Sequence, residues 1–169
     1  MSLRRVSTMS VGQGIVASYV HASVGEDMGR IAVLVGLESS AAAAGLADIG
    51  RKVAMHVAAS SPVALESSAI DPAVLEREKN VLAEKNAGKP PQVMEKIIES
   101  GLKTYFKEVC LLEQAFIHDT SKSVSQAVAE VGKAAGADIK ITGFVRYQVG
   151  EGIEKAESDF AAEVAGMAG

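Results

Sequence analysis

The sequence predicts an α+β fold: a three-stranded antiparallel sheet with helices packed on one face and an inserted antiparallel helical hairpin, a short coiled coil. Three observations predict it. Two neighbouring segments near the amino terminus, and one near the carboxyl end, have the period of two that places alternate side chains on opposite faces of a strand. The segments between them carry apolar residues at helical spacing. Two of those helical segments are separated only by a short turn rich in Gly and Pro, as in a helical hairpin.

The first two strands are expected at residues 15–22 and 30–37, the second because it is rich in β-branched residues. Residues 23–29 contain two glycines and should form a hairpin loop, which makes the strands antiparallel. Residues 41–60 change to helical spacing, and Pro62 ends that helix because it disfavours helical geometry in the preceding residue. One face of the first strand is expected to carry Ile15, Ala17, Tyr19 and His21.

The helical hairpin has the clearest local signals. Asp71 is a good N-cap and Pro72 suits the first helical position. A break at 86–91 separates this helix from a second one, expected over 91–108. The seam of the second helix is expected to consist of Met94, Ile97, Ile98, Gly101, Leu102 and Tyr105.

After a mixed stretch at 109–119, Thr120, Ser121 and Ser123 are candidate caps for a helix that runs to about Ala135. A third strand is expected over 138–149. One of its faces should carry Ile139, Ile141, Val145, Tyr147 and Val149, and the other Lys140, Thr142, Phe144, Arg146 and Gln148. In the tail, Ile153, Phe160 and Val164 fall near one face of a short helix, which makes the tail a candidate docking element.

Four parts of the chain are predicted. Residues 1–10 form a leader, whose first three residues look like an expression remnant ahead of a native chain that began earlier. Residues 11–60 and 110–149 together form the α+β core domain, and residues 61–109 form the inserted hairpin. Residues 150–169 form a carboxy-terminal docking helix.

Composition narrows the function classes. The net charge of −4 and the lack of a Lys/Arg cluster argue against nucleic-acid binding, which needs a basic face to displace counterions. No apolar run is long enough to span a bilayer, so no membrane role is expected. The single cysteine, Cys110, permits no internal disulfide, and a reduced, cytoplasmic setting fits best.

Candidates for catalysis are few. His21, His56 and His118 are far apart in the sequence and form no metal-ligand spacing. We expect His56 to be an ordinary helix residue at the sheet edge and Cys110 to be a small buried hydrophobe. The chain has no phosphate-binding glycine loop, and its carboxylates are spaced along helix faces. We therefore predict no enzyme, cofactor, metal or small-molecule substrate, but a surface that binds another protein.

Several runs of residues resemble segments of bacterial elongation factor Ts. Each run alone is a weak signal, but the combination is highly specific and covers nearly the whole chain from Arg4 to Met167. The runs are YVH at 19–21, AMHVAAS at 54–60, SGLK at 100–103, LLEQAF at 111–116, TGFVRYQVGEGIEK at 142–155 and DFAAEV at 159–164.

The resemblance implies a guanine-nucleotide exchange factor for the translational GTPase elongation factor Tu, working without chemistry of its own. Such a factor disturbs the Mg²⁺ and phosphate site of the GTPase and speeds GDP release. In thermodynamic terms it binds the nucleotide-free state more tightly than the GDP state, and by linkage it weakens GDP by the same factor.

The resemblance also implies contact residues. His21 matches the histidine of the family's Y-x-H strand, which touches the GTPase, and Tyr19 is its neighbour on that face. Ile117 and His118 match an apolar pair used by the family, from which His118 departs. The tail containing Ile153, Phe160 and Val164 matches the family's carboxy-terminal module.

The family's amino-terminal helical domain and its TDFV motif are absent from this sequence, so we expect this polypeptide to retain part of the docking surface but little exchange activity. Two other hypotheses stay open. A structural adaptor would bind its partner through the helical hairpin, and a small hydrolase would use His21 or His118, although no nucleophile and orienting carboxylate accompany them.

Overall fold

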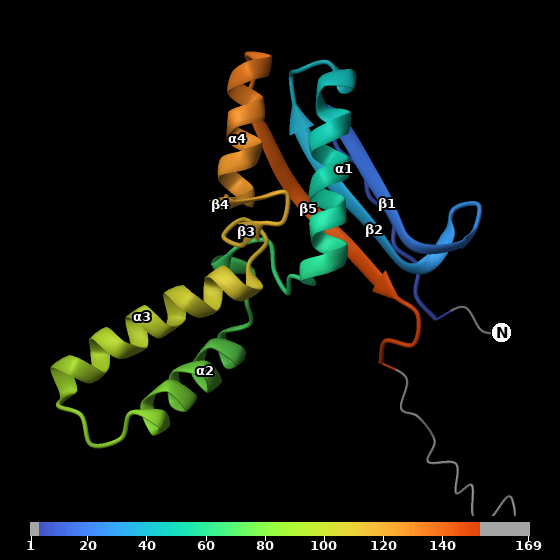
Figure 1. Cartoon of the computed structure of the whole chain (residues 1–169). Helices are drawn as coiled ribbons and strands as arrows, with labels where there is room; N and C mark the ends of the chain where they lie inside the picture. The colour runs from blue at the N-terminus through green and yellow to red at the C-terminus, as the bar shows by residue number, and fades with distance from the viewer. Residues whose placement is uncertain (1–3, 153–169) are drawn as a thin grey trace, which may run out of the picture.

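Three antiparallel strands form the main sheet of the computed structural model, which describes residues 4–152. β1 (Gly14–Gly25) pairs with β2 (Met28–Ser39), and β5 (Ile139–Gln148) pairs with the other edge of β2, giving the order β1-β2-β5 (Figure 1). All three predicted strands are confirmed, and so is the α+β class.

The β1–β2 hairpin is longer than expected. The strands continue through most of the stretch predicted as a loop, up to a tight turn at Glu26 and Asp27. The register shifts between Ser23 and Gly25, next to Ala22, which has a φ of 50°. This bulge adds twist to the ribbon and lets pairing resume beyond it.

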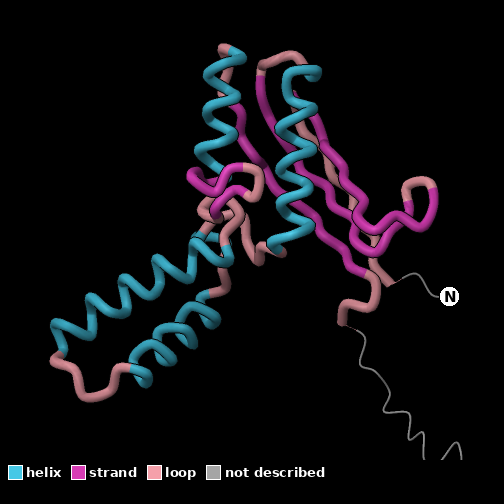
Figure 2. The backbone as a smooth tube through the Cα atoms, in the orientation of Figure 1, coloured by secondary structure: helices cyan, strands magenta, loops and turns pink. Residues whose placement is uncertain are grey.

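Two helices cover one face of the sheet (Figure 2). α1 (Ala43–Ser60) lies on β1 and β2, and ends at Ser61, which takes a left-handed conformation before Pro62. α4 (Val124–Ala135) lies beside β5. Of its three candidate caps only Ser123 acts: its hydroxyl accepts from the Gln126 N–H while the Gln126 side chain accepts from the Ser123 N–H, a capping box.

The core lies between this helical layer and the sheet. It combines the inward face of the strands with one face each of α1 and α4, as the two periodicities require. Its buried members are Ala17, Val33, Val35, Leu37, Ile49, Val53, Ala54, Val57, Ala58, Leu111, Phe116, Val124, Ala127, Val128 and Ile141.

The inserted hairpin consists of α2 (Pro72–Lys85) and α3 (Pro91–Val109) and projects from the body (Figure 1). Asp71 caps α2 by accepting from the Ala73 N–H, as predicted. Neither helix has a fully buried residue. A small separate cluster anchors the base of the hairpin, built on Ala64, Ile70 and Cys110 and packed against Val74, Leu75, Tyr105, Phe106 and Val109.

A second, two-stranded sheet was not predicted. β3 (Ala115–Phe116) and β4 (Asp119–Ser123) form a short hairpin, in which β3 lies in the stretch expected to be mixed and β4 continues beyond the end of that stretch. Thr120 and Ser121, expected as helix caps, lie in β4 instead. The strands are too short and too polar for a period of two to be recognisable in the sequence.

The face assignment of β5 is wrong beyond Ile141. A register shift between Gly36 and Leu37 of β2 leaves Thr142 unpaired between Ile141 and Gly143, so β5 bulges there. The residues after the bulge change face. Phe144 packs against the core, whereas Val145 and Tyr147 line a concavity on the outer face of the sheet together with Ser18, Val20, Ala32 and Leu34.

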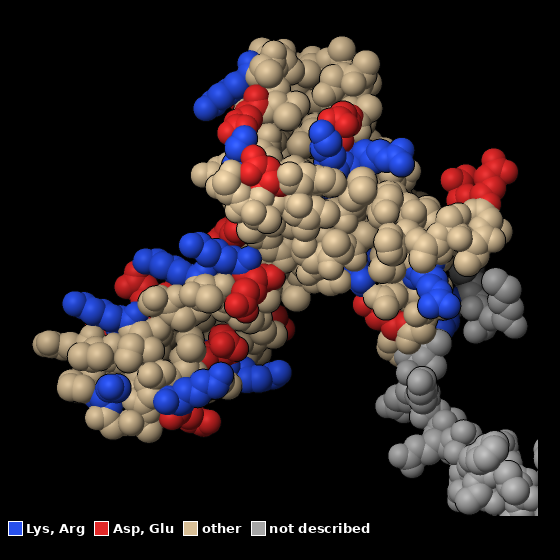
Figure 3. Space-filling model, in the orientation of Figure 1, with Lys and Arg blue, Asp and Glu red and all other residues tan. Residues whose placement is uncertain are grey.

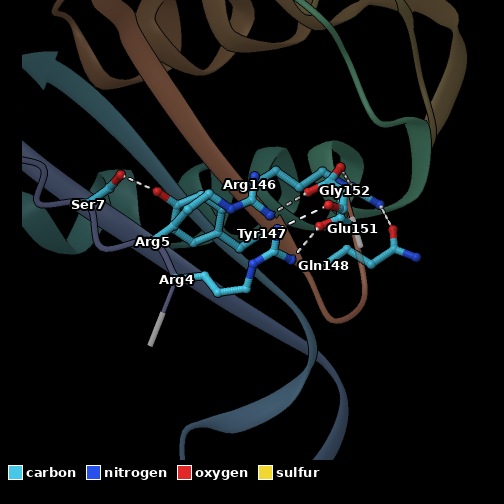
Figure 4. Close-up of polar contacts among 8 residues, drawn as sticks. All are labelled: Arg4, Arg5, Ser7, Arg146, Tyr147, Gln148, Glu151 and Gly152. Carbon is cyan, nitrogen blue, oxygen red and sulfur yellow. Dashed lines mark hydrogen bonds and ion pairs between the residues drawn. The ribbon is translucent and has the colours of Figure 1, made fainter. Parts of the chain in front are cut away.

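The amino-terminal segment is tied to the end of β5 by polar contacts (Figure 4). Arg4 donates to the carbonyl oxygens of Glu151 and Gly152 at 3.3 and 3.0 Å. Arg5 forms an ion pair with Glu151 at 3.2 Å, and its guanidinium carbon lies 4.7 Å from the centre of the Tyr147 ring. Both side chains of this ion pair are about half exposed, so it contributes about 1 kcal/mol at most.

None of the helices within residues 4–152 combines the length and the apolar character needed to cross a bilayer. The docking helix predicted in the tail lies outside the described residues, except for its first three positions.

Candidate functional site

A surface groove of about 240 Å³ lies where α1, β1, β2 and the β3–β4 loop meet. We call it the α1–β1 groove. It is lined by Tyr19, His21, Ile31, Met55, Ala58, Ala59 and Ile117.

β1 places two of these side chains side by side. Tyr19 and His21 are two residues apart on one strand and therefore share a face. Tyr19 is half-buried and packs against the core, whereas His21 is exposed. The Tyr19 hydroxyl lies 3.1 Å from His21 Nδ1. When the hydroxyl donates this bond, the proton of His21 is on Nε2, where it is available to a partner.

The last turns of α1 form the opposite wall. Met55, Ala58 and Ala59 are spaced i, i+3 and i+4, so they lie on one side of the helix. The two alanines leave room in front of the strands. The half-buried Met55 adds an apolar side chain that can adapt to different shapes.

Ile117 closes one end of the groove. The residue is 41% exposed, which leaves an apolar side chain accessible to a partner. Its backbone N–H donates to Nδ1 of the fully buried His56 at 3.2 Å. His56 Nε2 is in turn 2.8 Å from Oε1 of Gln114, whose Nε2 donates to the Glu108 carbonyl oxygen at 2.7 Å.

His118 is exposed and does not line the groove. Its ring meets Phe116 edge-on, with 5.0 Å between ring centres, and the Phe116 ring centre lies 5.8 Å from that of His56. His118 and the buried His56 therefore both contact Phe116.

The groove contains no Asp, Glu, Lys or Arg. Figure 3 shows few charges over the middle of this face, where α1 meets the β1–β2 ribbon, whereas charges of both signs cover the α2–α3 hairpin. Behind the groove, burial is the largest effect and lowers the pKa of His56. The hydrogen bond to Gln114 opposes this shift, and the nearby His118 lowers the pKa further. The net shift favours the neutral form of this buried histidine.

The remaining groups offer little chemistry. Cys110 is a buried free thiol, as predicted, and burial raises its pKa, so it is a poor nucleophile. Among residues 4–152, no three His, Cys, Asp or Glu side chains gather as metal ligands would.

A larger concavity of about 430 Å³ lies between α4 and β5, lined partly by Leu65, Val128 and Ile141. It gathers none of the residues singled out in the sequence. The α1–β1 groove is smaller, but its lining includes Tyr19, His21 and Ile117, three residues that the sequence analysis predicted as contacts. We therefore treat this groove as the candidate site.

The structure thus brings Tyr19, His21 and Ile117 together and places His118 beside them. Ile153, Phe160 and Val164 lie outside the described residues. The sequence analysis did not predict that Met55, Ala58 and Ala59 of α1 line the groove, although their helical spacing is visible in the sequence. It also did not predict that His56 is fully buried in α1 and contacts the β3–β4 loop through the Ile117 N–H.

Comparison with known proteins gives a consistent result. The family model described as elongation factor TS matches residues 1–151. The chain is 60% identical to elongation factor Ts of Bradyrhizobium diazoefficiens, over the whole of this chain and 56% of that protein. It is 58% and 59% identical to the proteins of the same name from Methylorubrum populi and Methylocella silvestris, over 99% of this chain and 55% of each relative. The chain thus spans little more than half the length of these relatives.

Proposed function

Because the chain belongs to the elongation factor Ts family, we propose that it binds the translational GTPase elongation factor Tu and takes part in releasing its GDP. The site would act in the cytoplasm, and the chain would supply a binding surface with the chemistry left to the GTPase.

The observation that carries this proposal is the α1–β1 groove, because it has the character of a hot spot for a protein partner. Its lining contains no Asp, Glu, Lys or Arg, and it combines the apolar Ile31 and Met55 with the exposed His21. Its volume of about 240 Å³ lies below the range of typical small-molecule pockets, roughly 300–1,000 Å³. A groove of this size suits one or two side chains inserted from a partner.

The mechanism is thermodynamic linkage. A surface that binds the nucleotide-free GTPase more tightly than the GDP form must weaken GDP binding by the same factor. Every tenfold preference corresponds to about 1.4 kcal/mol of coupling. Tyr19 and His21 contribute to this coupling only if their contacts differ between the two states of the partner.

Calorimetric titration with His21→Ala tests the groove. We expect binding to nucleotide-free elongation factor Tu to weaken by about 1–3 kcal/mol, as for a hot-spot residue. Ser18→Ala is the matched control, because Ser18 is exposed on the opposite face of the same strand. Equal affinities of the two variants would remove His21 from the contact surface. No binding by the unaltered chain would overturn the proposal itself.

A second measurement separates binding from exchange. Release of a fluorescent GDP analogue from elongation factor Tu reports exchange directly. We expect this 169-residue polypeptide to bind but to stimulate release only weakly, because its sequence contains no TDFV segment. Full stimulation would show that the groove and its surroundings are sufficient for exchange.

The projecting hairpin keeps the adaptor hypothesis open. Replacing residues 79–98 by a short Gly/Ser turn removes the tip but keeps the cluster at the base of the hairpin. If the groove is the docking site, affinity for elongation factor Tu stays within about threefold of the original, well under the tenfold loss of 1.4 kcal/mol. Loss of binding would favour the hairpin as the contact surface.

A further inference from the structure

His56 is buried between two distant parts of the chain that both build the groove. It is fully buried in α1, and its ring nitrogens contact Gln114 and Ile117, which are 58 and 61 residues away in the sequence. Both ring nitrogens therefore form hydrogen bonds with residues 114–117, the segment that leads into the β3–β4 hairpin.

The two contacts define one tautomer. A backbone N–H can only donate, so Nδ1 of His56 must accept from Ile117 without a proton of its own. The proton is then on Nε2, which donates to Oε1 of Gln114. The amide of Gln114 is oriented by its other end, because its Nε2 donates to the Glu108 carbonyl oxygen. Each donor in this series of three hydrogen bonds meets an acceptor, so the orientations of the His56 and Gln114 side chains fix each other.

The β3–β4 hairpin needs this support. β3 has only two residues, and its register shifts between Ala115 and Phe116. A ladder this short does not define the position of the following residue by itself. Phe116 is anchored in the core, whereas Ile117 is only partly covered. The hydrogen bond from the Ile117 N–H to His56 Nδ1 ties this backbone directly to α1.

We propose that His56 is a positioning residue for partner docking, which holds Ile117 at the edge of the α1–β1 groove through its unprotonated Nδ1. The docking role of His56 rests on the proposed function, whereas its positioning of Ile117 does not. A leucine could fill the same volume, but it would leave the Ile117 N–H and the Gln114 Oε1 without partners inside the protein.

Two conservative variants separate the two nitrogens. In His56→Asn, the side-chain oxygen can occupy the place of Nδ1 and still accept from Ile117, whereas the contact to Gln114 is lost. In His56→Gln, the longer side chain reaches the place of Nε2 and keeps the contact to Gln114, whereas Ile117 loses its acceptor. Both variants lose ring volume, so a general packing defect should affect them similarly.

Three measurements follow. In the unaltered chain, nitrogen NMR should show an unprotonated Nδ1 with a scalar coupling to the Ile117 amide nitrogen. Hydrogen exchange at the Ile117 amide should stay slow in His56→Asn and become at least about tenfold faster in His56→Gln, with His118→Asn as a neighbouring control for exchange. Affinity for elongation factor Tu should follow the same order, about tenfold weaker for His56→Gln than for His56→Asn.

A protonated Nδ1, or equal Ile117 exchange in the Asn and Gln variants, would overturn the positioning role. If the two variants bind elongation factor Tu equally but differ in hydrogen exchange at the Ile117 amide, His56 holds the β3–β4 loop but the loop does not contribute to docking. If the unaltered chain does not bind elongation factor Tu, the proposed function fails and the docking role falls with it. The hydrogen-exchange measurements at the Ile117 amide would then still decide whether His56 positions Ile117.

Discussion

Because α1 approaches β1 closely at Gly50, we expect Gly50→Ala to lower the free energy of unfolding relative to Gly45→Ala in the same helix. A methyl group on Gly50 would lie 2.8 Å from Cβ of Ala17 and 3.0 Å from Cδ1 of Leu37. The first atom belongs to a short side chain on a paired strand, which cannot move aside without moving the strand. Gly50 therefore sets how closely α1 lies on β1, and so how the helix wall of the groove faces Tyr19 and His21.

The expected magnitude comes from a matched substitution in the same helix. Gly45 has open space at its side-chain position, so Gly45→Ala should stabilise the fold by up to about 1 kcal/mol through helix propensity. Gly50→Ala has the same gain but also an overpacking cost of about 1–3 kcal/mol. The difference between the two variants isolates the contact, and Gly50→Ala should be the less stable by about 1–3 kcal/mol.

Urea denaturation followed by far-ultraviolet circular dichroism measures this difference. The double variant Ala17→Gly/Gly50→Ala provides a further check, because it removes the methyl group that the new one meets. Its free energy of unfolding should exceed the value expected from adding the two single effects. If Gly50→Ala stabilises the protein as much as Gly45→Ala does, the close packing of α1 on β1 is not what limits this position.

Three further predictions concern stability and reactivity. Burial holds the pKa of His56 below its ordinary value of 6.5, so the unfolded chain takes up the proton first. The free energy of unfolding should fall as pH decreases from 6.5, and urea titrations at several pH values should show a weaker dependence in His56→Asn. Ser123→Ala removes the capping box of α4 and should cost about 1 kcal/mol in the same assay, against little change for Ser121→Ala. Cys110 should react with a thiol reagent far more slowly than the unfolded chain does, and a native rate equal to the unfolded one would contradict its burial.

Much of the fold could be predicted because its signals are local. The period of two in the strands, the cap at Asp71 and the stop at Pro62 each depend on residues within one element. The structure confirms the three strands, the cap and the stop, although the faces in β5 change after Ile141. Local rules also gave the shared face of Tyr19 and His21, which is half of the candidate groove.

Two of the failures have a common physical cause, since each depends on a partner that is distant in the sequence. The bulge at Thr142 follows from how β5 pairs with Gly36 and Leu37 of β2, and it changes the face of every later residue in the strand. The β3–β4 hairpin is a short polar segment whose main anchor, Phe116, is buried by residues of other elements. Neither pattern is present in a window of ten or fifteen residues.

The groove therefore consists of two kinds of residue that mutational studies should treat differently. Tyr19, His21 and Ile117 are at the surface, where a partner can touch them, and a sequence motif can identify them. His56 and Gly50 are buried and cannot touch a partner, yet they determine where the contact residues lie. Affinity depends on preorganisation as well as on contacts. An alanine scan limited to exposed residues would therefore miss part of the energy of docking, and the missing part should reside in the buried contacts of α1.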